Sequence, residues 1–244
     1  QCEINAVQLA LLPLIHNPNW TNAAEIIADA GITIVSGMLE ASGEDYTSLE
    51  TIAKTGGLRQ EAMWESTIEN TKRVANSAAE IGIPLVTFHA GFIPEERCNE
   101  RSKMLDHLHM MTEVCIDCGV SLGLETGQES AGNAASILIE LRLDELGVNF
   151  DPANMILYGK GDPIEAMNIL QPWVQQVHIK DAKHTEVQGT WGTEVPVGKG
   201  DVAWESFLKL VPEHVNLVIE REGGANRIND IKQAKQMLQE LGAC

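Results

Sequence analysis

Seven short, nearly continuous apolar runs recur along the chain, and most are followed by a longer stretch with helical periodicity. Glycine closes most of the helical stretches, as at Gly31, Gly82, Gly119 and Gly147. Runs that are apolar throughout, rather than alternating with polar residues, are typical of parallel strands buried on both faces. The repeated strand–helix order therefore predicts an α/β fold built on a parallel sheet.

The expected strands cover residues 4–11, 32–38, 84–91, 120–126, 148–152, the start of 175–183, and 216–221. The expected helices cover residues 19–30, 62–81, 95–118, 131–146, 163–170, 204–210 and 230–241. Residues 13–18, 40–58 and 184–201 are expected to be loops. No linker or change of composition interrupts this order, so residues 1–244 are expected to form a single domain.

The number of strand–helix units points to a TIM barrel. A (β/α)₈ barrel needs eight units and commonly takes ~250 residues. Seven units in 244 residues, beginning abruptly in a strand, predict such a barrel with its first β/α unit missing from this chain. A doubly wound sheet is the alternative, but its first strand is normally followed by a glycine-rich turn. Residues 11–16 contain no glycine.

Charge, hydrophobicity and cysteine content exclude several classes of protein. The formal net charge is −18 and the pI is near 4.7, which disfavours binding to nucleic acid or to an anionic membrane surface. No apolar run approaches the ~20 residues that cross a bilayer. The five cysteines are an odd number in a large chain, so no disulfide framework is expected, and Cys115 and Cys118 are interpreted as ordinary helix residues. We expect a soluble, cytoplasmic protein.

Ionisable residues stand at the ends of consecutive expected strands. Strands four to seven end in Glu125, Asp151, His178 and Glu220, and in a parallel barrel such ends face one another. Three converging carboxylates would repel one another strongly without a cation. Taken alone, Asp151 before Pro152 also fits a helix N-cap. As a set, carboxylates with one imidazole suit Mn²⁺, Mg²⁺, Co²⁺ or Zn²⁺.

The same strand ends carry a family resemblance. The motifs 122–125 (LGLE), 149–154 (NFDPAN), 177–181 (VHIKD) and 218–222 (VIERE) resemble those of the xylose isomerase-like barrel superfamily, and 196–202 (PVGKGDV) resembles its segment before the penultimate helix. Within it, the chain is most similar to the sugar (phosphate) isomerase/epimerase branch, which includes keto-sugar 3-epimerases and inosose isomerases and dehydratases. The resemblance implies one divalent metal, with Mn²⁺ first among the four ions, held by Glu125, Asp151, His178 and Glu220. It also implies that Glu125 and Glu220 form the catalytic acid/base pair.

Other polar residues near these ends receive secondary roles. His89, Lys180, Arg221 and Asn154 are interpreted as substrate-binding residues, with a structural histidine or pairing to nearby carboxylates as the alternatives. Asp181 is interpreted as a residue that orients His178 or a lysine from behind.

These residues lead to a functional hypothesis. We expect a divalent-metal-dependent isomerase or epimerase that acts on a small keto-sugar or cyclitol by glutamate-mediated proton transfer through a metal-bound enediolate. A dehydratase or lyase on a keto-sugar or keto-inositol is the alternative, since it would share that intermediate. A non-catalytic sugar-binding barrel and an endonuclease IV-like repair enzyme fit less well. Asn154 stands where the latter would place a histidine, and residues 191–201 contain no histidine. The superfamily often dimerises or tetramerises, so a homo-oligomer is expected.

Overall fold

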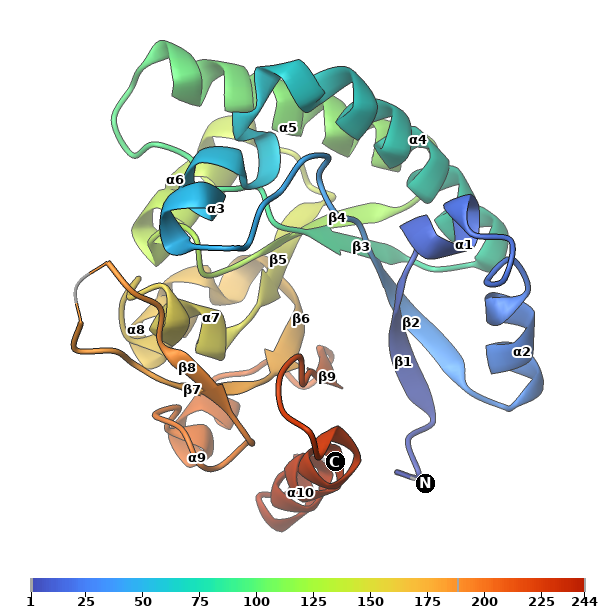
Figure 1. Cartoon of the computed structure of the whole chain (residues 1–244), viewed down its shortest axis with the longest axis vertical. Coiled ribbons are helices and arrows are strands. Elements are labelled where there is room, and N and C mark those ends of the chain that lie inside the picture. The colour runs from blue at the N-terminus through green and yellow to red at the C-terminus, as the bar shows by residue number, and fades with distance from the viewer. Residues whose placement is uncertain (1, 188, 244) are drawn as a thin grey trace. The chain divides into compact units, whose positions relative to one another are not determined.

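The computed structural model describes residues 2–187 and 189–243, and its main element is a sheet of seven parallel strands. The strands are hydrogen-bonded in the order β1-β2-β3-β4-β5-β6-β9, with β7 and β8 in a separate two-stranded sheet (Figure 1). They span β1 (Ala6–Ala10), β2 (Thr33–Met38), β3 (Leu85–Phe88), β4 (Ser121–Glu125), β5 (Leu146–Phe150), β6 (Val174–Ile179), β7 (Asp181–Lys183), β8 (Thr193–Val195) and β9 (Asn216–Ile219). All seven predicted strands are confirmed, and the fold is of the α/β, TIM-barrel class.

Helices connect most of the strands. They span α1 (Leu12–His16), α2 (Ala23–Asp29), α3 (Leu49–Thr55), α4 (Trp64–Ile81), α5 (Asn99–Asp117), α6 (Ala131–Leu141), α7 (Pro152–Leu157), α8 (Pro163–Leu170), α9 (Trp204–Leu208) and α10 (Arg227–Glu240). Short 3₁₀ helices span η1 (Gly57–Arg59), η2 (Glu61–Met63) and η3 (Gln171–Trp173). Within the described part of the chain, no helix has the length and apolar character to pass through a membrane.

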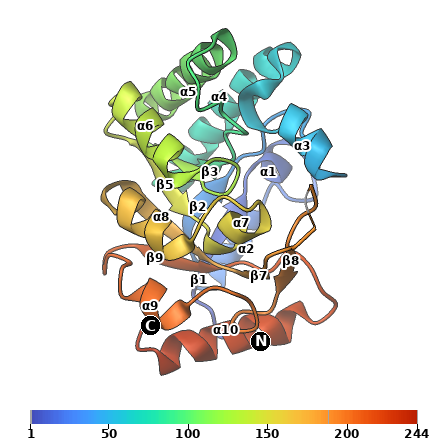
Figure 2. The same ribbon diagram turned by 90° about the vertical axis from the view of Figure 1, so that its left-hand side faces the viewer.

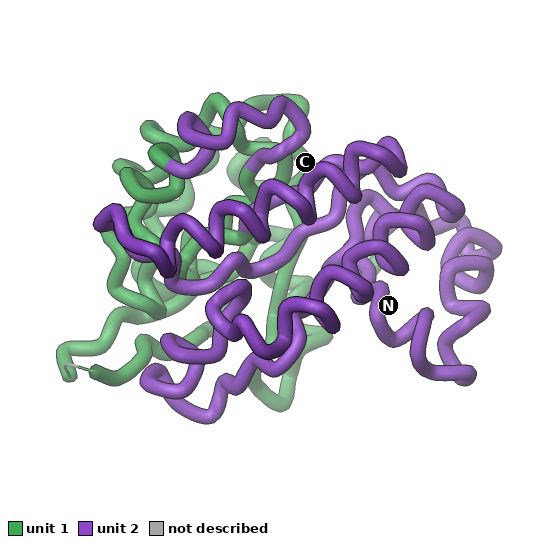
Figure 3. Tube along the Cα trace, turned by 90° about the horizontal axis from the view of Figure 1, so that it is seen from above, with its two compact units in different colours: residues 1–3, 125–136, 148–244 green, residues 4–124, 137–147 purple. Residues whose placement is uncertain are grey.

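Contacts divide the chain into two compact units (Figure 3). Unit 1 comprises Gln1–Glu3, Glu125–Ser136 and Val148–Cys244, and unit 2 comprises Ile4–Leu124 and Ile137–Gly147. Gln1, Gln188 and Cys244 lie outside the described residues. The prediction of a single domain over residues 1–244 therefore stays a prediction.

Unit 2 contains the first four strands and the two longest helices. β1, β2, β3 and β4 pair in parallel, with Leu85 to Phe88 in register with Ser121 to Leu124. The helices α4 and α5 lie side by side (Figures 1 and 2). Gly57 adopts a φ of +59°, and a Cβ there would lie 2.0 Å from the carbonyl carbon of Ala90. Only glycine lets this turn approach that backbone so closely.

Unit 1 contains β5 from Val148 onward, the strands β6 and β9, and the β7–β8 hairpin. The register pairs Phe150 with Val177 and Ile179 with Ile219, so β6 and β9 end together and β5 ends level with Val177, two residues before the end of β6. The hairpin pairs antiparallel, with Asp181 opposite Val195. This alignment of strand ends positions the site described below.

Several boundaries differ from the sequence predictions. The structure forms α1 and α3 in stretches predicted as loops, and α7 directly after Asp151, where none was predicted. It also forms β8 inside the segment 184–201 predicted as a loop. The predicted helix 131–146 ends at Leu141, because Arg142 adopts a left-handed φ of 52°. β5 then starts at Leu146 and takes Gly147 into the strand.

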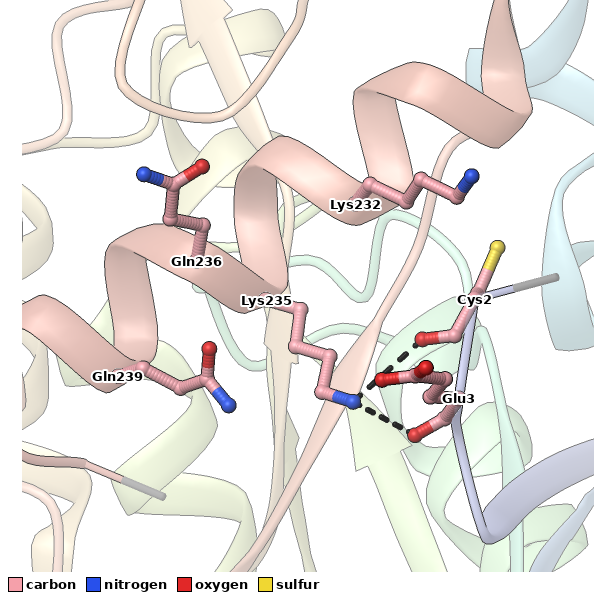
Figure 4. Close-up of a pocket in the computed structure, with 6 residues that line it drawn as sticks. All are labelled: Cys2, Glu3, Lys232, Lys235, Gln236 and Gln239. Carbon is pink, nitrogen blue, oxygen red and sulfur yellow. Dashed lines mark hydrogen bonds between the residues drawn. The ribbon is translucent and has the colours of Figure 1, made fainter.

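The first described residues are held by the last helix. Lys235 on α10 donates to the carbonyl oxygens of Cys2 and Glu3, at 3.4 and 2.6 Å (Figure 4). These residues line a pocket of about 300 Å³ together with Lys232, Gln236 and Gln239. The four described cysteines are all free.

Candidate metal centre

Four consecutive strands of the sheet each deliver one ionisable side chain at the carboxyl end. Glu125 is the last residue of β4, Asp151 follows β5, His178 is the penultimate residue of β6, and Glu220 follows β9. The peptide of Glu220 donates to Ile179 O at 3.2 Å, which continues the β6–β9 alignment one residue further. All four residues belong to unit 1. We refer to them as the carboxylate–histidine cluster.

His178 lies at the centre of the cluster. Its Nδ1 is 3.4 Å from Glu125 Oε1, 3.6 Å from Asp151 Oδ2 and 3.4 Å from Glu220 Oε2. One ligand atom from each residue falls within 4.8 Å of all the others. The side chains of Glu125, Asp151 and His178 are at most 3% exposed, and that of Glu220 is 17% exposed. The structure thus brings together all four residues that the sequence predicted as metal ligands.

The donor atoms fit a small divalent cation. An ion about 2.1 Å from two ligands at 90–110° to each other would place those ligands roughly 3.0–3.4 Å apart. The measured separations from Nδ1 lie at or just above this range. Asp151 Oδ2 is also buried and accepts no hydrogen bond. Burying a carboxylate oxygen in this way is costly unless a bound cation compensates for the missing hydrogen bond. One imidazole nitrogen and three carboxylate oxygens are donors that Mn²⁺, Mg²⁺, Co²⁺ and Zn²⁺ accept.

The cluster shifts the protonation of its own members. Burial opposes charge on His178, but the carboxylates of Glu220 and Glu125 raise its pKa well above the usual range. Burial likewise opposes charge on Glu220, but His178 and Lys180 hold the pKa of that carboxyl far below its usual range. Glu220 is therefore ionised at neutral pH.

Lys180 is a buried cation at the edge of the cluster, only 2% exposed. Its Nζ lies 2.9 Å from Glu220 Oε2 and 3.7 Å from Asp151 Oδ2, and it also pairs with Glu222. Burial opposes its charge, but the carboxylates, Asp151 foremost, raise the pKa of Lys180 well above its usual range. Lys180 is thus a permanent positive charge beside two of the cluster carboxylates.

Asn154, the substrate-binding candidate on α7, contacts the cluster directly. Its Nδ2 donates to Glu125 Oε1 at 3.0 Å, and its Oδ1 is 3.4 Å from Lys180 Nζ. Its peptide nitrogen donates to Asp151 Oδ1 at 2.9 Å, so Asp151 caps α7 with one oxygen and leaves the other for the cluster. Asp151 can therefore cap the helix and bind a metal ion at the same time.

Asp181 uses its carboxylate on a different part of the chain. It accepts five hydrogen bonds, from the peptide nitrogens of Ala182, Gly198, Gly200 and Val202 and from the indole of Trp204. Four of these five described donors belong to the segment after β8, the fifth is the neighbouring Ala182, and none is His178 or a lysine. Asp181 anchors that segment to the start of β7, so its predicted role behind His178 has no contact to support it.

Arg221, predicted to bind substrate, is engaged in two ion pairs. Its Nη1 lies 2.8 Å from Glu194 Oε1, and its Nε donates to Asp230 Oδ2 at 2.9 Å. Glu194 also accepts from the peptide nitrogens of Glu222 and Gly223. These contacts tie the segment after Glu220 to β8 and α10.

His89, the remaining substrate-binding candidate, follows β3 in unit 2. Its charge lowers the pKa of Glu44, although burial has the larger and opposite effect and the pKa of Glu44 is raised. Glu44 Oε1 accepts from the peptide of Gly57 at 2.8 Å. His89 therefore has a buried carboxylate as its neighbour within its own unit.

Two residues behind the cluster were not predicted from the sequence. Asn149 Nδ2 lies 3.1 Å from His178 Nε2 and 3.3 Å from Glu125 Oε2, and Gln176 Nε2 donates to Asn149 Oδ1 at 3.1 Å. Both are fully buried amide side chains inside strands of the sheet. That pattern was a usable signal, because a buried amide needs polar partners.

An aromatic pair also lies near the cluster. The rings of Tyr158 and Trp191 are 5.9 Å apart between centroids. Burial raises the pKa of Tyr158 to about 12, and the charges of Lys180 and Glu222 also act on its hydroxyl group. The phenol therefore stays protonated and can donate a hydrogen bond at neutral pH.

Comparison with known proteins gives a family and a set of structural relatives. The family described as xylose isomerase-like TIM barrel matches residues 5–242. A xylose isomerase domain protein from Planctomyces limnophilus has 31% sequence identity and a TM-score of 0.86, over 97% of this chain and 87% of that one.

Two more distant solved structures share the fold. The probable 3-DHS dehydratase AsbF from Bacillus anthracis has 18% identity and a TM-score of 0.73, over 96% of this chain and 88% of that one. A D-tagatose 3-epimerase-like protein has 19% identity and a TM-score of 0.72, over 97% and 88%. Among curated proteins, the uncharacterized YihM of Escherichia coli (strain K12) is 26% identical over 147 residues. That match spans 58% of this chain and 45% of YihM, less than half of its length.

Proposed function

Because the chain belongs to the xylose isomerase-like TIM barrel family, we propose that it is a divalent-metal-dependent isomerase or epimerase of a small keto-sugar or cyclitol. The family assignment confirms the resemblance seen in the strand-end motifs. The observation that carries the proposal is the convergence of Glu125, Asp151 and Glu220 on Nδ1 of His178, at 3.4–3.6 Å. These four residues would hold the ion, which we propose to be Mn²⁺, with Mg²⁺, Co²⁺ and Zn²⁺ as alternatives.

A bound divalent ion would polarise a substrate carbonyl and stabilise negative charge on its oxygen. The protein's own residues supply the proton transfers. Glu220 is ionised beside Lys180 and would remove the proton next to the carbonyl. Glu125, on β4 three places along the sheet from β9, would take up a proton from solvent and deliver it from its own side, and Glu220 would release the abstracted proton to solvent. Return to the opposite face of the same carbon gives epimerisation, and delivery to the neighbouring carbon gives isomerisation.

The surrounding residues would orient the reacting groups. Asn154 donates to Glu125 Oε1 and thereby fixes the orientation of that carboxylate. Lys180 keeps Glu220 charged and offers further hydrogen bonds to a substrate oxygen. Tyr158 and Trp191 would provide an aromatic face for the carbon side of a sugar ring. The partner proposed is a small molecule, and the charge of −18 disfavours nucleic acid.

A dehydratase is the second candidate. Two observations favour it over other reaction classes. The first is the fold shared with a probable 3-DHS dehydratase. The second is Lys180, a buried ammonium group that could donate a hydrogen bond to a substrate hydroxyl as that hydroxyl takes up a proton and leaves as water. Elimination would start with the same proton removal by Glu220, so the two reactions differ only in what leaves next.

Solvent proton exchange tests the proposal. The metal content of the purified protein is measured first, and then deuterium uptake at the carbon next to the carbonyl of a panel of keto-sugars and inososes. Glu125→Gln and Glu220→Gln should each slow exchange by about 10²–10⁴-fold. Glu205→Gln, on the exposed surface of α9, is the matched control and should leave the rate unchanged. Exchange that continues in both buried variants at equal metal content would refute the acid/base assignment, and net loss of water would select the dehydratase.

A further inference from the structure

Asn149 and Gln176 form a short chain of amides behind His178. They stand directly opposite each other in the β5–β6 ladder, and both are fully buried. Asn149 Nδ2 faces the ring nitrogen Nε2 at 3.1 Å, while its Oδ1 accepts from Gln176 Nε2 at 3.1 Å. Gln176 Oε1 is buried without a hydrogen bond. The chain of contacts therefore runs from the ring through two amides and ends in one unused acceptor.

The two nitrogens of His178 face different surroundings. Nδ1 faces the three carboxylate oxygens, so Nδ1 is the atom that would bind an ion. A histidine binds a metal through an unprotonated nitrogen, and the neutral ring then carries its proton on the other one. The metal-binding form of His178 thus has its proton on Nε2, opposite Asn149.

An amide can meet a ring nitrogen with either end. With its nitrogen toward the ring, Asn149 donates, Nε2 accepts, and the ring proton lies on Nδ1 where an ion would bind. A half-turn of the amide presents Oδ1, which accepts the proton on Nε2. The same half-turn breaks the 3.3 Å hydrogen bond from Asn149 Nδ2 to Glu125 Oε2 and directs Nδ2 at Gln176, whose amide turns with it to present Oε1, the unused acceptor. A bound ion would offset the negative charge of Glu125, which loses this donor. Each of the two amide settings is therefore compatible with only one form of the ring.

We propose that Asn149, backed by Gln176, is a positioning residue that holds the proton of His178 on Nε2 and leaves Nδ1 to the metal ion. The inference rests on the proposed metal site and extends it to residues that lie outside the cluster. Metal-binding histidines generally donate their second N–H to a carboxylate, a carbonyl or water. Here a side-chain amide on the neighbouring strand takes that place, and a second amide fixes its orientation.

Two substitutions at one position separate this role from simple packing. Asn149→Asp keeps an acceptor for the ring proton, and its second oxygen still accepts from Gln176. Asn149→Leu keeps the volume but removes both hydrogen bonds. The proposal predicts that Leu weakens Mn²⁺ binding by about 10–100-fold and that Asp weakens it less than about threefold. A packing role predicts the reverse order, because leucine suits an apolar core and a new buried carboxylate near Glu125 does not.

The binding constants are measured by calorimetric titration of the full chain with Mn²⁺, with circular dichroism to verify the fold. Asn168→Leu and Asn168→Asp, on the exposed side of α8, are matched controls and should bind as the wild type does. If Asn149→Leu does not fold, Gln176→Leu removes the backing amide and should weaken binding by about three- to tenfold. An unchanged constant in whichever of these leucine variants folds would overturn the proposal.

Nuclear magnetic resonance of ¹⁵N-histidine-labelled protein supplies a second readout. In the Mg²⁺- or Zn²⁺-loaded wild type, His178 should carry its proton on Nε2, with its signal identified by its loss in His178→Asn among the seven histidines. If the proton lies elsewhere in the metal-loaded wild type, the positioning role of Asn149 is wrong, but the proposed metal site is unaffected. A wild type that binds no divalent ion at all would refute both.

Discussion

Replacing Asp181 with asparagine tests whether one buried carboxylate holds the segment that follows β8. Its Oδ2 accepts from Gly198 N at 2.8 Å, from Gly200 N at 3.0 Å and from the Trp204 indole at 3.0 Å. Its Oδ1 accepts from Ala182 N at 2.9 Å and from Val202 N at 3.3 Å. The residue is fully buried, so water cannot replace any of these bonds. Asparagine has the same shape but only one accepting oxygen.

The cost follows from the best orientation of the new amide. Its oxygen would replace Oδ2 and keep three donors, and its NH₂ group would then face the peptide N–H groups of Ala182 and Val202. A hydrogen bond to a charged acceptor contributes about 1.5–3 kcal/mol, so losing two, one of them long, costs about 3 kcal/mol. For a chain of this size that corresponds to a fall in Tm of roughly 6–12 °C.

Urea unfolding followed by circular dichroism measures this loss. Asp162→Asn is the matched control, because Asp162 accepts from Ile164 N and Glu165 N at the exposed start of α8. Asparagine caps helices about as well as aspartate, so the control should change the unfolding free energy by less than about 0.5 kcal/mol. If Asp181→Asn costs no more than the control, the anchoring role of this carboxylate is wrong.

Three further outcomes follow from the structure. Loading with Mn²⁺ at about 100 times its Kd should stabilise the protein by about 2.7 kcal/mol over a chelator-treated sample, and equal Tm values would count against the metal site. Burial raises the pKa of the Cys115 thiol to about 12, so at pH 8 it stays protonated and should resist a thiolate-specific reagent, whereas exposed Cys98 reacts. Mass spectrometry of the labelled native protein checks this, and rapid labelling of Cys115 would contradict it. Gly127→Ala should lower proton-exchange activity, because Gly127 has a φ of +132° and an added Cβ would lie 2.4 Å from Asn154 Cβ. The clash would displace Asn154, which donates to Glu125, so unchanged activity would contradict this.

The cluster could be predicted from sequence because of a property of parallel sheets. Strands that run in the same direction end at the same edge, so four ionisable residues at four consecutive strand ends are neighbours in space. In the structure, β6 and β9 end together, and β5 ends two residues earlier, just before the level of His178. Strand ends alone were enough, and no side-chain geometry was required.

The partners of single polar side chains could not be predicted in this way. Asp181 lies three residues from His178, and a role behind that ring was the natural interpretation of this short separation. Apart from the neighbouring Ala182, its donors instead come from residues 198–204, and the folded hairpin of β7 and β8 brings that segment to it. Arg221 next to Glu220 illustrates the same difficulty, since its partners Glu194 and Asp230 come from β8 and α10. Short elements such as α1, α3 and β8 carry too few residues for periodicity to show.

Charge balance explains why Lys180 belongs beside the cluster. The carboxylates of Glu125, Asp151 and Glu220 carry three negative charges. A divalent ion bound by a neutral His178 supplies two positive charges, and the ammonium group of Lys180 supplies the third. The buried group of charges is then neutral, which matters because uncompensated charge is costly away from water. A monovalent ion would leave one negative charge and a trivalent ion one positive charge, so this arrangement of residues suits a divalent ion on electrostatic grounds as well as by donor type.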